Sequence, residues 1–460
     1  MRVVSRAAIG VAVVSLVGTG LSACSASSGG GGGGGGGGNK SLNILMVNNP
    51  QMVALQKVAP QFTKATGIKV NFTVKPENDL RSTAATEFSQ QAGQYDLATL
   101  SNFEIPIYAK KGWVADLTKY TTDAKASFDG KDFDQGDILK PMAKSLTVDG
   151  KIYGEPFYGE SSFTMYRKDL FKAAGLTMPA DPTWQQIAGF AQKLNKPGKV
   201  AGICLRGAVG WGQVMAPLTT VVNTFGGTWF DKNWDAKLNT GGFKKATEFY
   251  VNLVQKYGEK GAAQSGFTEC DNAMIQGQAA MWYDATSAAG TFSASKYAND
   301  MGYVAAPVDQ VKNAGWLYTW AWGVEKASKN QDAAWKFISW ASGKGFPAVI
   351  GAGSGTGMGW ANVPAGARAS LYDNPEYLKV ASTFAKPTLA AINAAVPDGS
   401  NRPTHPPVPG IQFVGVAQFT DFGQTVSQQI SNAIAGSTSV QAALDASQKI
   451  AQNGVKEYKK

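Results

Sequence analysis

Apolar and polar residues alternate along the chain after position 40 in a way that predicts strands and helices in turn. In the first helix, Leu55, Val58 and Phe62 fall on one face, and Gly67 follows as a stop signal. The predicted elements are a buried strand at 42–47, a helix at 52–65, a half-buried strand at 68–74, a helix at 80–92 and a strand at 96–100. Strand–helix–strand units of this spacing connect by right-handed crossovers and give a parallel sheet. The region is therefore predicted as an α/β domain, in which ligands bind beyond the carboxyl ends of the strands.

A similar alternation resumes after residue 180. Thr183 and Gln186 form a capping box at the start of a helix that carries Trp184 on its apolar face. Further helices are predicted at 213–225, 243–257 and 333–341, strands at 200–205, 279–283, 303–306 and 317–324, and two amphipathic helices in the C-terminal tail. An α/β unit is thus predicted on each side of the stretch 151–170.

That stretch carries two acids among aromatic rings in a segment predicted to be extended. Glu155 and Glu160 lie close to Tyr153, Phe157 and Tyr158. A carboxylate accepts hydroxyl protons while a ring stacks on apolar faces, so this composition suits a polar, uncharged ligand. An ordinary strand with solvated acids is the alternative interpretation.

The first 39 residues are predicted to lie outside the fold. Arg2 and Arg6 precede a short apolar segment, and Leu-Ser-Ala-Cys at 21–24 has the form of a bacterial lipobox. This pattern predicts a signal peptide at 1–23 and a lipid anchor on Cys24, with an ordinary signal peptide and an incidental cysteine as the alternative. Residues 24–39 contain an unbroken glycine run and are predicted to be a flexible tether.

The composition is that of a folded, mildly basic globular protein. With 460 residues, 44% of them hydrophobic, the chain is long enough for two domains. The net charge is +10, but the lysines are scattered without basic blocks between aromatic residues, so nucleic acid is not an expected partner. Besides Cys24 the chain has Cys204 and Cys270. An even remainder in an exported chain favours a disulfide between them, with two buried thiols as the alternative.

Catalytic chemistry has few candidates in this sequence. The single histidine, His405, stands among prolines, which argues against a metal site or a catalytic triad. No glycine-rich segment matches a phosphate-binding loop, and no cofactor is predicted. The acids near predicted strand ends, which could pair as in a glycosidase, are Glu104, Glu155, Glu160 and Asp284. Sugar-binding proteins use the same residue types without hydrolysis, so the acids leave both functions open.

Several tryptophans occupy glycine-rich or strand-end positions, where a ring could stack on a sugar or polyol. They are Trp211, Trp229, Trp320, Trp322 and Trp360. Each could equally be a packing residue.

A set of short motifs carries a family resemblance. They are Tyr-Gly-Glu-Pro-Phe-Tyr-Gly-Glu-Ser-Ser-Phe-Thr-Met-Tyr-Arg-Lys-Asp-Leu-Phe at 153–171, Gly-Ile-Cys-Leu-Arg-Gly at 202–207, Gly-Trp-Gly at 210–212, Phe-Gly-Gly-Thr-Trp-Phe at 225–230, Ala-Met-Trp-Tyr-Asp-Ala-Thr at 280–286, Gly-Trp-Ala-Asn-Val-Pro at 359–364 and Leu-Tyr-Asp-Asn-Pro at 371–375. In order and spacing they resemble the extracellular solute-binding proteins, family 1, of ATP-binding-cassette importers. The likeness is strongest to the sorbitol/mannitol-type polyol binders and spans residues 43–452.

The resemblance implies a two-lobe, periplasmic-binding-protein-like α/β fold with a hinge of crossing strands and a ligand cleft between the lobes. One lobe would comprise residues 40–158 plus 320–350, and the other residues 159–319 plus 351–460. Crossings would fall near 158–165, 316–322 and 351–359, with Glu160 at the first hinge. The residues implied in ligand binding are Asn49, Glu104, Glu160, Arg206, Trp211, Trp229, Asp284, Trp320 and Trp360.

The main hypothesis is a non-catalytic, monomeric lipoprotein on the extracellular face of a bacterial cell membrane. It would capture a polyol or small sugar by lobe closure and deliver it to the permease of an importer. One alternative is an exported carbohydrate-active hydrolase that uses two of the cleft carboxylates. Another is a structural or sensory surface protein that binds no soluble ligand.

Overall fold

A computed structural model describes residues 41–313, 315–353 and 355–459. The predicted signal peptide (1–23), Cys24 and the tether (24–39) lie outside the described residues. None of the helices in the described part of the chain is both long and apolar enough to cross a membrane.

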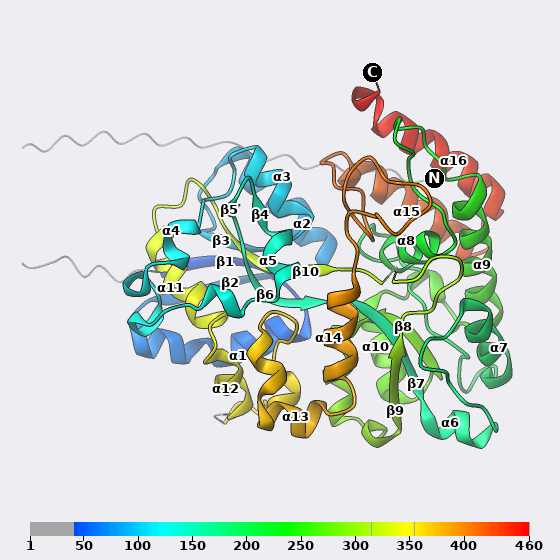
Figure 1. Ribbon diagram of the computed structural model, residues 1–460, viewed down its shortest axis with the longest axis horizontal. Coiled ribbons are helices and arrows are strands. Elements are labelled where there is room, and N and C mark those ends of the chain that lie inside the picture. The colour runs from blue at the N-terminus through cyan, green and yellow to red at the C-terminus, as the bar shows by residue number, and fades with distance from the viewer. Residues whose placement is uncertain (1–40, 314, 354, 460) are drawn as a thin grey trace, which may run out of the picture. The chain divides into compact units, whose positions relative to one another are not determined.

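The first of two large sheets has the strand order β2-β1-β3-β10-β6 (Figure 1). Its strands are β1 (Ser41–Val47), β2 (Lys69–Lys75), β3 (Leu97–Ser101), β6 (Glu155–Glu160) and β10 (Tyr318–Val324). β1 pairs in parallel with β2 and β3, whereas β10 is antiparallel to both β3 and β6. The parallel unit predicted from the sequence is confirmed, and the later strand β10 enters the same sheet from far along the chain.

Helices surround this sheet, and every residue of β3, β6 and β10 is buried, as expected for strands covered on both faces. The associated helices are α1 (Pro50–Thr66), α2 (Glu77–Gln90), α3 (Glu104–Lys110), α4 (Thr118–Thr121), α5 (Lys140–Ser145), α11 (Gln331–Ala341) and α12 (Phe346–Gly351). α1 begins with Pro50, where the missing N–H costs nothing, and ends at Gly67 with a φ of 73°. A small ribbon of β4 (Thr147–Val148) and β5 (Lys151–Ile152) precedes β6.

The second large sheet has the order β8-β7-β9 and is antiparallel. Its strands are β7 (Ser162–Arg167), β8 (Met281–Ala285) and β9 (Met301–Ala305). The strand predicted at 200–205 is instead an irregular segment, joined to its neighbours by isolated bridges such as Ala201 to Ala279 and Cys204 to Trp282. At Gly202 the backbone packs directly against the helix that contains Ala191. A Cβ atom at Gly202 would lie 2.1 Å from the carbonyl oxygen of Ala191.

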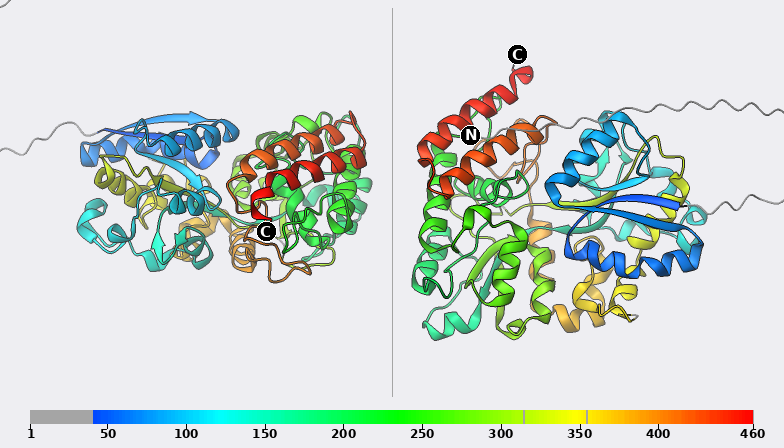
Figure 2. Two further views of the ribbon diagram at one scale, coloured as in Figure 1. Left: turned by 90° about the horizontal axis from the view of Figure 1, so that it is seen from above. Right: turned by 180° about the vertical axis from the view of Figure 1, so that it is seen from behind.

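The remaining helices lie mostly around this sheet (Figure 2). They are α6 (Lys168–Ala173), α7 (Trp184–Leu194), α8 (Met215–Thr224), α9 (Gly241–Tyr257), α10 (Phe267–Gln276), α13 (Pro375–Ala381), α14 (Ala385–Ala394), α15 (Phe419–Ile434) and α16 (Val440–Gly454). The helices predicted after Thr183, at 213–225, at 243–257 and in the C-terminal tail are confirmed, whereas those at 168–173, 267–276, 375–381 and 385–394 were not predicted. The capping box of Thr183 and Gln186 is present at the start of α7. The two amphipathic tail helices are present as α15 and α16, and their buried residues face the rest of the chain.

We call the part built on the β2-β1-β3-β10-β6 sheet the first lobe and the part built on β8-β7-β9 the second lobe. The chain crosses between them at Ser161, between β6 and β7, and again between β9 and β10. Residues 365–368, predicted to be in the second lobe, contact the first: Ala365 O accepts from Gly159 N, and Arg368 pairs with Asp137. The full division at 40–158 plus 320–350 and 159–319 plus 351–460 stays a prediction.

Candidate functional site: a cleft between the lobes

A cavity of about 390 Å³ lies between the two lobes and is lined by residues of both. Other hollows of about 510 and 560 Å³ occur in the described residues, but neither gathers buried charges and aromatic rings from both lobes. The cleft is therefore the strongest candidate site.

On the second-lobe side, Arg206 is fixed by Asp284, which lies in β8. The guanidinium donates through Nε to Asp284 Oδ2 at 2.8 Å and through NH2 to Oδ1, and its NH1 donates to Gly212 O at 2.8 Å. Asp284 also accepts from Trp282 Nε1 at 3.0 Å and is fully buried. Burial alone would lower the pKa of Arg206, but the charge and hydrogen bonds of Asp284, together with the charges of Glu77 and Glu160, outweigh it and hold this pKa above the usual value. The guanidinium is thus charged and aimed into the cleft, while Asp284 lies behind it.

The first-lobe side carries a matching cluster around Arg81, in the second turn of α2. Glu77, one helical turn earlier, accepts from Arg81 NH2 at 2.8 Å, and the NH1 group forms an ion pair with Glu104. The hydroxyl of Tyr318 on β10 is a further partner of Arg81, and the other oxygen of Glu104 accepts from Ser101 N at 2.9 Å. Burial would lower the pKa of Arg81, but Glu104, Tyr318 and Glu77 together raise it above its usual value. Glu104 therefore lies behind an arginine, as Asp284 does in the other lobe.

Glu160, the last residue of β6, lies where the first strand crossing begins and lines the cleft. The residue is 8% exposed, and its carboxyl accepts a hydrogen bond from Ser287 Oγ. Burial raises the pKa of Glu160 to about 8, against the lowering effect of the Ser287 hydroxyl. At neutral pH this carboxyl is therefore largely protonated and can donate as well as accept a hydrogen bond.

Aromatic rings complete the lining. Trp316, Tyr318 and Trp320 come from β10 and the segment before it, and Tyr158 stacks on Trp320 with ring centres 6.4 Å apart. Asn49, at the start of α1, donates to the hydroxyl of Tyr158 at 2.7 Å. Rings beside neutral and charged hydrogen-bonding groups are suited to a small polyhydroxylated molecule.

The structure brings part of the predicted ligand-binding set together. The members that line the cleft are Asn49, Glu160, Arg206, Trp211 and Trp320. Glu104 and Asp284 support the two arginines from behind. Whether any of these residues contacts a ligand stays a prediction.

Two predicted tryptophans do not reach this cavity. Trp229 is covered by Phe243 and Phe419 and donates through Nε1 to Thr219 Oγ1 at 3.2 Å. Trp360 begins a short 3₁₀ helix and packs beside Gly351. Their glycine-rich contexts suggested open backbone, but neighbouring helices occupy that space.

Glu77 and Arg81 also line the cleft, although neither was predicted as a site residue. The signal was present as an acid and a base four residues apart at the start of a helix that follows a parallel strand. An i,i+4 pair of this kind is common on solvated helix faces, so its place in the cleft became visible only with the fold.

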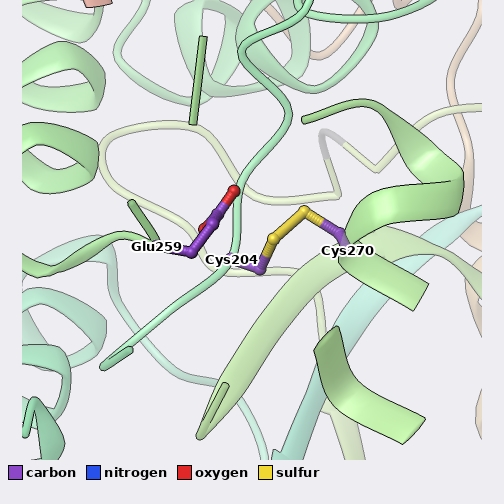
Figure 3. Close-up of side chains that lie close together, drawn as sticks. All are labelled: Cys204, Glu259 and Cys270. Carbon is purple, nitrogen blue, oxygen red and sulfur yellow. A yellow bond between two sulfur atoms is a disulfide. The ribbon is translucent and has the colours of Figure 1, made fainter. Parts of the chain in front are cut away.

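Cys204 and Cys270 are joined by a disulfide in the structure (Figure 3). Their sulfurs and the carboxylate of Glu259 form the one group of three side chains in the described ranges whose spacing could hold a metal ion. Because each sulfur is bonded to the other, neither is free as a thiolate ligand. The disulfide links the segment before Arg206 to α10, whose first residues line the cleft.

Comparison with known proteins identifies the family to which this chain belongs. The model of the bacterial extracellular solute-binding protein family matches residues 48–345. The chain is also 38% identical to the mannitol-binding protein of Pseudomonas aeruginosa over 437 residues, which cover 93% of this chain and 96% of that protein. The chain belongs to the bacterial extracellular solute-binding proteins.

Two further relatives of this solute-binding protein are informative. A crystal structure of a solute-binding protein from Agrobacterium vitis with bound D-mannitol is 41% identical and superposes with a TM-score of 0.86, covering 91% of this chain and 99% of that one. The erythritol/L-threitol-binding protein of Mycolicibacterium smegmatis is 27% identical over 66% of this chain and 67% of its own. These likenesses confirm the predicted family and the two-lobe α/β fold.

Proposed function

We propose that this solute-binding protein captures an acyclic polyol of the mannitol type, or a small sugar, and delivers it to the permease of an importer. The observation that carries the proposal is the cleft itself, a buried space where fixed donors and aromatic rings from two lobes converge. The bound D-mannitol of the Agrobacterium vitis relative and the polyols named for the two other relatives support this ligand class.

The chemistry of the lining supports an uncharged ligand rather than an ion. Arg81 and Arg206 are each neutralised by a carboxylate, and Glu160 has its pKa raised to about 8. A ligand entering this space meets hydroxyl-matching donors and acceptors, and the two buried guanidinium groups that it meets are each already paired with a carboxylate. Hexitols and pentitols offer a row of hydroxyls for the polar groups and C–H edges for the rings.

Calorimetry of the exported chain carrying Cys24→Ser tests the proposal with mannitol, sorbitol, ribitol, erythritol, glucose and maltose. We expect saturable binding with the tightest dissociation constant for a polyol. No saturable binding to any of these compounds would reject the ligand class.

Glu160→Ala provides the residue-level test. Because Glu160 lies at the end of β6 in the cleft, its truncation removes a buried hydrogen-bonding group, and we expect affinity to fall by about 10- to 100-fold, matching about 1.5–3 kcal/mol. Trp360→Phe, which changes a ring outside the cleft, is the matched control and should bind normally. Near-normal affinity in Glu160→Ala would move the site elsewhere.

We infer that binding occurs without turnover. Glu104 and Asp284, which a glycosidase mechanism would need free, are each committed to an arginine. Prolonged incubation with glycosides and product analysis should give no release above background, and release that depends on Glu160 would favour a hydrolase.

We further propose that the chain acts as a monomer held to the outer face of the membrane through acyl chains on Cys24. Mass spectrometry of the membrane fraction should find a diacylglyceryl-modified N-terminal cysteine. Cys24→Ser should release the protein from that fraction, and unchanged membrane retention would contradict the anchor.

A further inference from the structure

A direct contact joins the lobes at one end of the cleft, between Arg81 of the first lobe and Trp211 of the second. The Arg81 guanidinium carbon lies 3.9 Å from the centre of the Trp211 ring, a distance at which a cation interacts favourably with an aromatic face. Both side chains are almost fully buried, Arg81 at 6% exposure and Trp211 at 2%. Desolvation strengthens such a contact, so the pair is well placed to stabilise the arrangement in which the two lobes touch here.

The donors of Arg81 are nearly all committed within the first lobe. Its Nε and NH2 groups donate to Glu77, its NH1 group to Glu104, and NH2 also to Tyr318, which leaves one of the five N–H groups without a partner in that cluster. The N–H groups in the plane of the guanidinium therefore hold it in position within the first lobe. Its flat faces remain for aromatic rings, of which Trp211 is the nearest at 3.9 Å, whereas Trp320 of its own lobe lies at 5.4 Å.

Trp211 is also enclosed by aromatic rings of both lobes. Phe103 of the first lobe lies 4.8 Å from it between ring centres, and Phe419 of the second lobe lies at 5.5 Å. Opening of the cleft would separate Trp211 from Arg81 and Phe103 and expose a large apolar ring to water.

Weaker polar contacts accompany this pair along the start of α2. Gln213 Nε2 donates to Glu77 Oε2 at 3.3 Å, and Asn78 Nδ2 donates to Val209 O at 3.4 Å. Both distances are long for hydrogen bonds, so these contacts align the segments rather than hold them.

We propose that Arg81 and Trp211 form an interlobe latch that stabilises the closed state before ligand enters, and that Arg81 is accordingly a positioning residue. Apparent affinity for a ligand scales with the fraction of molecules in the binding-competent state. The latch raises that fraction by a contact made between protein groups alone. It therefore increases the affinity for every ligand of the cleft by the same factor and leaves their rank order unchanged.

Small-angle X-ray scattering of the ligand-free chain carrying Cys24→Ser tests the latch, in the parent and with Trp211→Leu or Arg81→Lys added. Lysine keeps the charge of Arg81 but has no planar face to stack on the ring. We expect the radius of gyration of the parent to be smaller than that of either variant. The matched control is Arg167→Lys, because Arg167 stacks on Tyr297 at 3.5 Å entirely within the second lobe, and this variant should scatter as the parent does.

Calorimetry of the same proteins gives the second readout. Loss of the latch should weaken binding of two different polyols by an equal factor of about 10, as expected for a shift in the closed population rather than the loss of a ligand contact. This part rests on the proposed function, but the scattering of ligand-free protein does not. Failure of all polyols to bind would reject the ligand class and leave the scattering result to decide the latch.

Equal radii of gyration for the ligand-free parent and Trp211→Leu would overturn the proposal. So would a loss of affinity that differs strongly between two polyols, because that result indicates a direct ligand contact. Circular dichroism establishes that each variant is folded, and Trp211→Leu alone decides the question where Arg81→Lys does not fold.

Discussion

The two arginines of the cleft occupy similar places in their lobes but are held differently. Arg206 makes three hydrogen bonds, two to Asp284 and one to Gly212 O, so two of its five N–H groups remain for other partners. Arg81 makes four within its own lobe and presents its face to Trp211. The same side chain thus serves in one lobe as a donor directed into the cleft and in the other as a contact between lobes.

The difference follows from the elements that carry them. Arg206 lies in an irregular segment whose backbone is fixed by β8, by the disulfide at Cys204 and by the hydroxyl of Tyr250, which donates to the Arg206 carbonyl at 2.7 Å. Arg81 projects from helix α2 and depends on side chains for its position. We therefore expect the second-lobe side of the cleft to be rigid and the first-lobe side to depend on its charge cluster.

The largest expected loss of stability comes from removing the carboxylate that pairs with each arginine. Asp284→Ala leaves the buried Arg206 without the one ion-pair partner that it has among the described residues, and should lower the free energy of unfolding by about 3–5 kcal/mol. Glu104→Ala should cost less, about 1–3 kcal/mol, because Glu77 still pairs with Arg81. Urea denaturation followed by circular dichroism measures both. Equal losses of unfolding free energy in the two variants would contradict the proposed contrast between Arg206, which pairs with one carboxylate, and Arg81, which pairs with two.

Removal of the disulfide probes the rigidity of the second-lobe side. The bond closes a loop over a sequence separation of 66 residues, and its loss through paired Cys204→Ser and Cys270→Ser substitutions should lower the free energy of unfolding by about 2–4 kcal/mol. Because α10 and the Arg206 segment line the cleft, affinity for the polyol should fall as well.

The first lobe supplies the control for this measurement. Gln91→Ala removes two hydrogen bonds on the far side of the first lobe, to Phe88 O and Trp113 O, and should lower stability without a change in affinity. An unchanged dissociation constant in the disulfide variant would show that the second-lobe side keeps its geometry without the bond.

The sequence was sufficient for most of the fold because its apolar periodicity is regular. α1, α7, α9, α15 and α16 appear where amphipathic patterns or caps placed them, and the parallel start of the first sheet follows from strand–helix spacing. The prediction of a strand at 200–205 was wrong, because a short apolar run does not reveal that Gly202 packs against a neighbouring helix.

The site was less predictable for a related reason. Glu160 and Arg206 lie in motifs and reach the cleft, but Trp229 and Trp360 lie in equally glycine-rich motifs and do not. Which ring is covered depends on helices such as α15 that arrive from the far end of the chain. The distinction between a carboxylate that faces the cleft and one that supports an arginine depends likewise on long-range pairing.

The smallest expected effect concerns pH. It sharpens the comparison by adding Glu160, a buried acid of the cleft that forms no ion pair with either arginine. Burial raises the pKa of Glu160 to about 8 in the structure, whereas a carboxyl exposed by opening of the cleft would have a lower value. The closed state therefore binds more protons than the open state between those two values. Affinity should be highest at low pH, fall as pH rises toward 8, and level off above it.

The same sign applies to folding, because the stabilisation from a raised carboxyl pKa is complete below the unfolded value and is lost as pH rises through about 8. Glu160→Gln keeps a neutral hydrogen-bonding group of similar shape and cannot titrate, so its dissociation constant should stay level from pH 5 to 9. Calorimetric titration of both proteins across that range measures the difference. If the dissociation constant of the parent is also independent of pH, Glu160 has the same protonation state in the open and closed states. Closure would then not depend on desolvating this acid.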